Sequence, residues 1–142
     1  MTVAAILGDN PPEVVTVGPD ASVRDAVALL SERRIGAVPV VDGGRVAGIM
    51  SERDVMHCLA RDGAAVLDSP VGKIMTSPAI TVEPEKTVLS ALSLMTSRRI
   101  RHLPVVDGGR LIGIVSIGDL VKYRLDKIES EAEAMLTYIQ SV

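Results

Sequence analysis

Two short segments of the sequence place a serine three residues before an aspartate, directly after an apolar run that contains a glycine. The first pair is Ser51 and Asp54, and the second is Ser116 and Asp119. A carboxylate accepts two hydrogen bonds, which suits the paired hydroxyl groups of a ribose, and a helix that begins at the serine offers free backbone N–H groups to a phosphate. The same spacing is also a capping box, which only starts a helix, so a binding role and a structural role are both open.

The two pairs belong to a repeat, because the chain is one unit written twice with an offset of 65 residues. Residues 40–45 and 105–110 are identical, and 20 of the 42 aligned positions from Val15 to Met56 carry the same residue in both copies. Composition alone does not produce such a match. Each copy is too short to stabilise much structure alone, so we expect the two copies to bury their apolar faces against each other.

Each copy has the residue pattern of a strand, a helix, a hairpin and a second helix. In the first copy, a short β-branched strand at 14–17 precedes a helix that Ser22 caps. Two strands at 38–41 and 46–50 then flank a turn with two glycines, which is typical of an antiparallel hairpin. The second helix begins at Ser51. The sequence therefore predicts two β-α-β-β-α units.

The units divide the chain into two domains with a short connection. The first comprises residues 1–68, including the N-terminal segment, and the second comprises residues 79–142. Two prolines mark the linker at 69–78. In the second unit, no Pro or Gly follows the first turn of the last helix, so we predict one long C-terminal helix from Ser116 to Tyr138.

These features resemble a pair of CBS domains, the regulatory module named after cystathionine β-synthase. The resemblance is carried by the tandem units, the strand and turn at 103–107, and the Gly-Ile-x-Ser-x-x-Asp endings at 48–54 and 113–119. It covers nearly the whole chain and implies an α/β (α+β) fold whose two repeats are related by pseudo-twofold symmetry. Family members bind AMP, ADP, ATP, NAD or S-adenosyl compounds in the cleft between the repeats, and some bind no known ligand.

The resemblance also implies which residues would hold such a ligand. The family's ribose-binding aspartate and phosphate-side hydroxyl carry over to two pairs, Asp54 with Ser51 and Asp119 with Ser116. Arg53 is a further candidate for a phosphate contact, although an arginine at a helix start is more often simply solvated. Gly48 and Gly113 lack a side chain and could let a nucleotide approach the backbone.

The two copies differ just before the hairpin. The first has Gly36 and Ala37 there, whereas the second has Arg101 and His102. An arginine offers a planar fork of five donors to phosphate oxygens, and a histidine adds a donor that could make binding pH-sensitive, although both could also be a charged strand edge. We therefore expect unequal sites, with the one that holds Asp119 favoured for a phosphorylated ligand. Ala37 is expected among the aliphatic residues that line the other pocket.

Composition narrows the classes of function. With 15 Lys and Arg against 18 Asp and Glu, the formal net charge is −3, and the chain has no Phe or Trp and two Tyr. It lacks the basic field and the aromatic platforms typical of nucleic-acid binders. Its one cysteine, Cys58, excludes an internal disulfide. No apolar run approaches the ~20 residues that span a bilayer and no signal peptide is visible, so we expect a cytoplasmic protein without a membrane partner.

Sequence motifs of common enzymes are missing. The chain has no Gly-x-Gly-x-x-Gly, Walker loop, His-Glu-x-x-His or nucleophile elbow, and its two histidines are too few to predict a metal site. We therefore predict a non-catalytic module that requires no cofactor, binds an adenine nucleotide and signals by a conformational or dimer change. The alternative is a structural protein-interaction module with no nucleotide ligand.

The last helix carries apolar residues spaced alternately four and three apart, which is an a/d seam. Its members are Val121, Leu125, Ile128, Ala132, Met135 and Ile139. Such a seam packs against a twofold partner or against its own core, and its spacing alone favours neither a parallel nor an antiparallel pair. CBS pairs commonly associate face to face, so the resemblance implies a homodimer to which we expect this helix to contribute. We expect the signal to pass to an unidentified effector protein or through the dimer.

Overall fold

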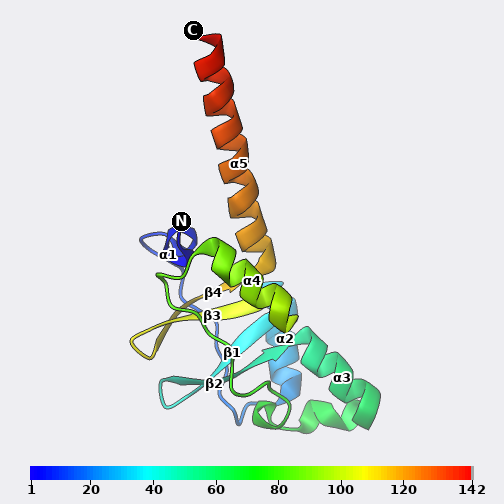
Figure 1. Cartoon of the computed structure of the whole chain (residues 1–142). Coiled ribbons are helices and arrows are strands. Elements are labelled where there is room, and N and C mark those ends of the chain that lie inside the picture. The colour runs from blue at the N-terminus through cyan, green and yellow to red at the C-terminus, as the bar shows by residue number, and fades with distance from the viewer. Residues whose placement is uncertain (142) are drawn as a thin grey trace.

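The structure is a computed structural model that describes residues 1–141, in which two similar repeats lie next to each other and a long helix projects from the second (Figure 1). The order of helices and strands confirms the α/β (α+β) prediction. In chain order the elements are α1 (Val3–Leu7), α2 (Val23–Arg33), β1 (Ala37–Asp42), β2 (Arg45–Ser51), α3 (Glu52–Asp62), η1 (Ala64–Asp68), η2 (Val71–Lys73), α4 (Val88–Arg98), β3 (His102–Asp107), β4 (Arg110–Ser116) and α5 (Ile117–Gln140).

Each repeat contains one antiparallel hairpin, as the glycine turns predict. β1 pairs with β2, and β3 pairs with β4, in the same register and with an irregularity at the same place in each ladder. In the first turn Gly43 and Gly44 have φ of 59° and 80°. A turn with two residues of positive φ matches the right-handed twist of the strands, and glycine adopts it without a steric penalty.

The strand predicted at 14–17 is reduced to a single bridge. Val17 pairs in parallel with Val40, where its N–H donates to Pro39 O (3.1 Å) and its carbonyl accepts from Val41 N (2.9 Å). A longer parallel ladder would need N–H groups at Pro39 and Pro19, which proline does not have. The ladder therefore ends after one residue on each side, and Val82 forms the matching bridge to Val105 in the second repeat.

The first helix of each repeat begins at the cap that the sequence predicts. The Ser22 hydroxyl accepts from Asp25 N at the start of α2, and the Thr87 hydroxyl accepts from Ser90 N at the start of α4. These side chains satisfy backbone donors that the first turn leaves free. One apolar stripe of each helix is buried against its hairpin, and the buried residues are Val23, Ala26 and Leu30 in α2, and Val88, Ala91 and Met95 in α4.

The segment that precedes each repeat in the chain packs into the core of the other repeat. Val3 in α1 is fully buried in the core of the second repeat, where its N–H donates to Lys86 O (2.8 Å). Val71 in η2, which follows the first repeat, is fully buried in the core of that repeat. The N-terminal segment, which the sequence groups with the first repeat, thus packs with the second. The predicted linker at 69–78 contributes to a core rather than only connecting the repeats.

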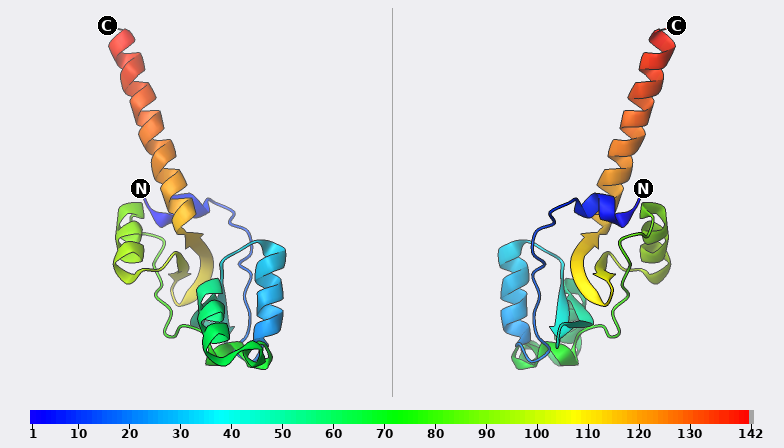
Figure 2. Two further views of the ribbon diagram at one scale, coloured as in Figure 1. Left: turned by 90° about the vertical axis from the view of Figure 1, so that its right-hand side faces the viewer. Right: turned by 90° about the vertical axis from the view of Figure 1, so that its left-hand side faces the viewer.

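The long C-terminal helix is confirmed as α5. Leu120 near its start is buried in the second core, and its first turns contact α1, α4 and β4. Beyond these turns the helix extends away from the body of the molecule, as the two side views agree (Figure 2). Among residues 1–141, no helix is long and apolar enough to cross a bilayer.

Candidate functional site

Two cavities lie where the repeats meet, and each contains one of the serine–aspartate pairs. The first cavity has a volume of about 140 Å³ and includes Ser51 and Asp54. The second has a volume of about 570 Å³ and includes Ser116 and Asp119. Ligand pockets usually measure about 300–1,000 Å³, so only the second is large enough in this conformation to enclose a whole small molecule.

Both serine–aspartate pairs form complete capping boxes. At the start of α3, Ser51 N donates to Asp54 Oδ2 (2.8 Å) and Asp54 N donates to Ser51 Oγ (3.2 Å). At the start of α5, Ser116 N donates to Asp119 Oδ2 (2.9 Å) and Asp119 N donates to Ser116 Oγ (3.1 Å). The structural role of the motif is therefore fulfilled in both repeats. The second oxygen of each carboxylate takes no part in the capping box and is the first candidate for a binding role.

The second carboxylate oxygen differs between the two cavities. Asp54 Oδ1 accepts a hydrogen bond from the Thr76 hydroxyl (3.1 Å). Within residues 1–141, Oδ1 of Asp119 accepts no hydrogen bond. A ligand hydroxyl would compete with Thr76 in the first cavity and would meet a free acceptor in the second.

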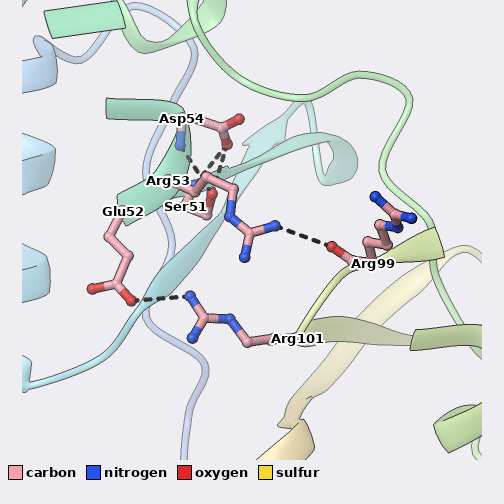
Figure 3. Close-up of polar contacts among 6 residues, drawn as sticks. All are labelled: Ser51, Glu52, Arg53, Asp54, Arg99 and Arg101. Carbon is pink, nitrogen blue, oxygen red and sulfur yellow. Dashed lines mark hydrogen bonds and ion pairs between the residues drawn. The ribbon is translucent and has the colours of Figure 1, made fainter. Parts of the chain in front are cut away.

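The structure places Arg101 in the first cavity, with Asp54, and not in the cavity of Asp119 where its position in the sequence predicts it. Its backbone carbonyl accepts from Ile117 N (2.8 Å), beside the Asp119 capping box. Its side chain, however, reaches across to the other repeat, where Arg101 Nη2 lies 3.5 Å from Glu52 Oε1 (Figure 3). The backbone thus belongs to one helix start while the guanidinium faces the other, a geometry that sequence proximity to Asp119 does not reveal.

Two further arginines line the first cavity. Arg53 at the start of α3 is exposed, and its Nη1 donates to the carbonyl of Arg99 (3.2 Å), which connects the two repeats (Figure 3). Arg99 ends α4 in the left-handed conformation with φ of 55°, which is uncommon for a residue other than glycine. Together with Arg101, three arginines line the cavity that contains Asp54.

Sequence reasoning did not select Arg99, nor its counterpart Arg34 in the second cavity. Arg34 likewise ends α2 in the left-handed conformation, with φ of 54°. The sequence does contain a pattern that could have selected them, because Arg33-Arg34-Ile35 recurs as Arg98-Arg99-Ile100 in the second copy. Glycine adopts this left-handed conformation without strain, so an arginine is unusual at both positions.

His102 lines both cavities and is half-buried between them. Burial lowers the pKa of its imidazole, and the neighbouring Arg101 charge lowers it further, while Glu52 and Asp119 act in the opposite direction. The imidazole is therefore mainly neutral at pH 7 and acts there as a hydrogen-bonding group rather than as a cation. The absence of a side chain at Gly36 leaves room for the imidazole of His102, since a Cβ at Gly36 would lie 3.1 Å from His102 Cε1.

The smaller predicted residues have mixed outcomes. Ala37 is buried and lines both cavities rather than one. The room beside Gly48 is already filled, because a Cβ there would lie 2.6 Å from the carbonyl oxygen of Thr76 and 2.7 Å from Met75 Sδ. This close approach of the chain to itself corrects the expectation that Gly48 admits a nucleotide. Gly113 lines the second cavity, but a Cβ there would lie 2.7 Å from a methyl group of Leu7.

Proline explains why the second cavity is larger. In the first repeat, Thr76 exchanges two backbone hydrogen bonds with Ile49 in β2 (2.8 and 3.0 Å), which closes the chain over that strand. The residue 65 positions earlier is Pro11, followed by Pro12, and both line the second cavity. Proline cannot donate to a neighbouring strand. Within residues 1–141, no backbone hydrogen bond joins this segment to β4, and the space between them is open and largely aliphatic.

No metal-binding cluster of three or more His, Cys, Asp or Glu residues occurs in the described part of the chain. Cys58, the single cysteine, is buried in α3. The groups that could contact a ligand are therefore carboxylates, guanidinium groups, one imidazole and apolar side chains, and they lie where the two repeats meet.

The family of the chain follows from this architecture and from direct comparison. The family model described as the CBS domain matches residues 10–61 and 71–126. The chain belongs to the CBS-domain family and contains two CBS repeats, as the sequence pattern indicates.

Several proteins similar to this chain are named as CBS domain-containing proteins. CBSX3, a mitochondrial CBS domain-containing protein of Arabidopsis thaliana, is 40% identical over 85% of this chain, which spans 61% of that protein's length. YhcV of Bacillus subtilis is 32% identical over 87% of this chain and 86% of its own length. The crystal structure of a CBS-domain containing protein from Agrobacterium tumefaciens is 43% identical, with a TM-score of 0.82 over 87% of this chain and 92% of that chain.

Two similar structures contain adenosine compounds. CBSX2 was solved in complex with AMP; it is 30% identical, with a TM-score of 0.75 over 88% of this chain and 96% of that chain. The CBS domain pair of protein MJ0100 was solved with 5′-methylthioadenosine and S-adenosyl-L-methionine; it is 27% identical, with a TM-score of 0.79 over 89% of this chain and 98% of that chain.

Proposed function

We propose that this protein is a non-catalytic regulatory module that binds a phosphorylated adenosine ligand, such as AMP, in the cavity around Asp54. One observation carries the proposal: Asp54 from the first repeat and Arg99 and Arg101 from the second line the same cavity. A ribose on the carboxylate and a phosphate on the guanidinium groups would bridge the two repeats.

Charge favours the Asp54 cavity for a phosphate. It has Arg53, Arg99 and Arg101 around it, against Asp54 itself and the nearby Glu52. Bidentate contacts from arginine to phosphate are among the stronger hydrogen bonds in proteins. In the second cavity the charged groups that line it are Arg34, Glu13 and Asp119, with His102 mainly neutral at pH 7. A dianionic phosphate would therefore meet an excess of negative charge there.

The first cavity must open to hold a whole nucleotide, because about 140 Å³ is below the usual range. The arginines that narrow it are exposed, and the Arg101–Glu52 pair has side-chain exposures of 51% and 63%. Such surface pairs contribute about 0–1 kcal/mol. A phosphate that replaces Glu52 as the partner of Arg101 would therefore move this side chain at little cost.

Relatives support an adenosine-containing ligand. One similar CBS structure contains AMP, and another contains 5′-methylthioadenosine and S-adenosyl-L-methionine. The second pair of compounds carries no phosphate and would suit the larger, more aliphatic cavity around Asp119. ADP, ATP and NAD share the adenosine and phosphate chemistry of AMP and remain part of the proposal.

Binding would act by changing how the repeats sit relative to each other. A ligand shifts such an equilibrium only when it binds one arrangement more tightly than the other. A phosphate that joins Arg99 and Arg101 to the Asp54 helix start meets this condition, because its contacts come from both repeats. The signal would pass to an effector protein or through a homodimer. The second candidate function is an interaction module that binds no nucleotide. It is favoured by the complete capping boxes, which give both serine–aspartate pairs a structural role without a ligand.

Calorimetric titration of the full chain with AMP, ADP, ATP, NAD, S-adenosylmethionine and 5′-methylthioadenosine tests the proposal. We expect saturable binding of AMP, and a thermal shift that corresponds to about 2.7 kcal/mol at 100 times the dissociation constant. Turnover of the nucleotide would contradict a non-catalytic role. Absence of binding for every compound would favour the interaction module.

A further inference from the structure

The outer part of α5 presents an apolar stripe that nothing in residues 1–141 covers. Its seam residues, apart from the smaller Ala132, are large and between 41% and 67% exposed: Val121, Leu125, Ile128, Met135 and Ile139. The helix extends away from the rest of the molecule in every view (Figures 1 and 2). Scattered surface leucines are ordinary, but a continuous stripe along a projecting helix is typical of an interface.

Only the start of the stripe lies close to the face of α5 that packs on its own body. Tyr123 packs against the second core, and it lies two residues from both Val121 and Leu125. Because each residue turns an α-helix by about 100°, Tyr123 is about 200° from each of these seam residues. Ile117 and Leu120 also pack against the second core, about 40° and 100° from Val121, so the body-facing side of α5 borders the seam near its start. Further along the helix, the seam residues Leu125, Ile128, Met135 and Ile139 are exposed and free to meet another helix.

Charges beside the seam change sign along the helix. In heptad terms the seam residues occupy a and d, and the flanking e and g positions hold Lys122 and Arg124 in the first half of α5. One heptad later the same two positions hold Glu129 and Glu131. The e and g positions set partner choice and orientation in coiled coils. This helix is therefore complementary to a copy of itself that runs in the opposite direction.

We propose that α5 pairs with α5 of a second copy of this chain as an antiparallel coiled coil. In an antiparallel pair, a residues face d residues, so Leu125 would face Ile128 of the other copy, and Val121 would face Ala132. This register places Lys122 opposite Glu129 and Arg124 opposite Glu131 across the twofold axis. Every flanking charge of these two heptads is then neutralised.

Another antiparallel register and a parallel pair would each form fewer pairs of opposite charge. An antiparallel register that overlaps the whole seam, with Val121 facing Ile139, would place Glu129 of one chain next to Glu129 of the other. It would also place the two Glu131 side chains next to each other. Like charges in contact destabilise such pairs. A parallel pair would join Arg124 to Glu129 but would leave Lys122 without an acidic partner. Charge thus selects both the direction and the register.

Disulfide trapping tests the proposal on the full chain with Cys58 replaced by Ser. Leu125→Cys and Ile128→Cys are made as separate proteins, and Asp126→Cys, which is exposed but off the seam, serves as the control. We expect the mixture of the Leu125 and Ile128 variants to form a mixed disulfide, identified by peptide mass, in severalfold excess over either self-linked product. Preferential self-linking of each variant would mean a parallel pair and would overturn the proposal. Linking no faster than in the control, as expected if another protein or the chain's own body covers the seam, would also overturn it.

A charge exchange provides a second, independent readout by sedimentation equilibrium at low salt. Lys122→Glu and Glu129→Lys should each raise the dimer dissociation constant at least fivefold, and the chain that carries both changes should recover most of the loss. A parallel pair predicts no effect of Lys122→Glu and no recovery, and that result would refute the antiparallel register. A monomeric wild-type chain at high concentration would do the same.

Discussion

The cavities around Asp54 and Asp119 are built from the same motif and have become different sites. Each places a capping-box carboxylate beside an arginine that ends a helix of the other repeat in the left-handed conformation. The first adds two more arginines and is closed over by Thr76, whereas prolines hold the second open. A few residues outside the motif thus decide charge and volume, while the motif itself decides only where a site can form.

Arginine replacement gives the largest expected difference between the cavities. Arg101→Ala removes a guanidinium from the Asp54 cavity, and charge-assisted hydrogen bonds contribute about 1.5–3 kcal/mol. Calorimetry should therefore show AMP binding weakened about ten- to a hundredfold, while adenosine binding changes little. The matched control is Arg34→Ala in the other cavity, which should leave AMP affinity within about twofold. Equal losses in both variants would remove the distinction between the sites.

The two glycines predict a difference in stability. A Cβ at Gly48 would lie 2.6 Å from the backbone oxygen of Thr76, whereas a Cβ at Gly113 would meet the end of the Leu7 side chain at 2.7 Å. Backbone cannot yield as a side chain does, so Gly48→Ala should lower the free energy of unfolding by about 1–3 kcal/mol and Gly113→Ala by clearly less. Urea denaturation measures both. A larger loss for Gly113→Ala would contradict the account of how each cavity is closed.

His102, whose counterpart in the first repeat is Ala37, gives a pH dependence to the shared wall of the cavities. Burial and Arg101 lower the pKa of its imidazole, so in the window below its usual value the unfolded chain binds more protons than the folded one. Its contribution to stability is therefore present above about pH 6.5 and is lost as the pH falls toward the lowered pKa. Wild type should lose stability from pH 8 to 5.5 relative to His102→Gln in urea denaturation. Parallel curves would show that the imidazole is not desolvated.

Thr76→Val gives the smallest expected effect and isolates the carboxylate of Asp54. The substitution keeps the shape of the side chain but removes the hydrogen bond from Thr76 to Asp54 Oδ1. One such bond is worth about 0.5–1.5 kcal/mol net, so freeing the oxygen should tighten AMP binding about two- to twelvefold. Calorimetry with AMP and with 2′-deoxy-AMP measures this, since only a ribose with both hydroxyl groups should benefit. An equal gain for the deoxy compound would separate Asp54 from ribose recognition.

Local chemistry was predictable from the sequence, and contacts across the repeats were not. The caps at Ser22 and Thr87 and the glycine turns depend on residues within a few positions, so spacing alone specifies them. The repeat predicted that two similar sites exist.

The position of Arg101 depends instead on how two separately formed hairpins meet, which no local pattern describes. The same holds for the exchange of leading segments, where Val3 completes a core that begins some 80 residues later. Even so, prolines at known positions explain afterwards why the ladder at Val17 is short and why the second cavity is open.

Matched replacement of the two capping aspartates is the most direct measurement. Asp54→Ala and Asp119→Ala remove equivalent groups and should cost similar stability, about 0.5–2 kcal/mol each. If a nucleotide bridges the repeats through the arginine-lined cavity, calorimetry with AMP will show binding abolished by Asp54→Ala and retained by Asp119→Ala. Binding that survives Asp54→Ala and disappears with Asp119→Ala would contradict this account.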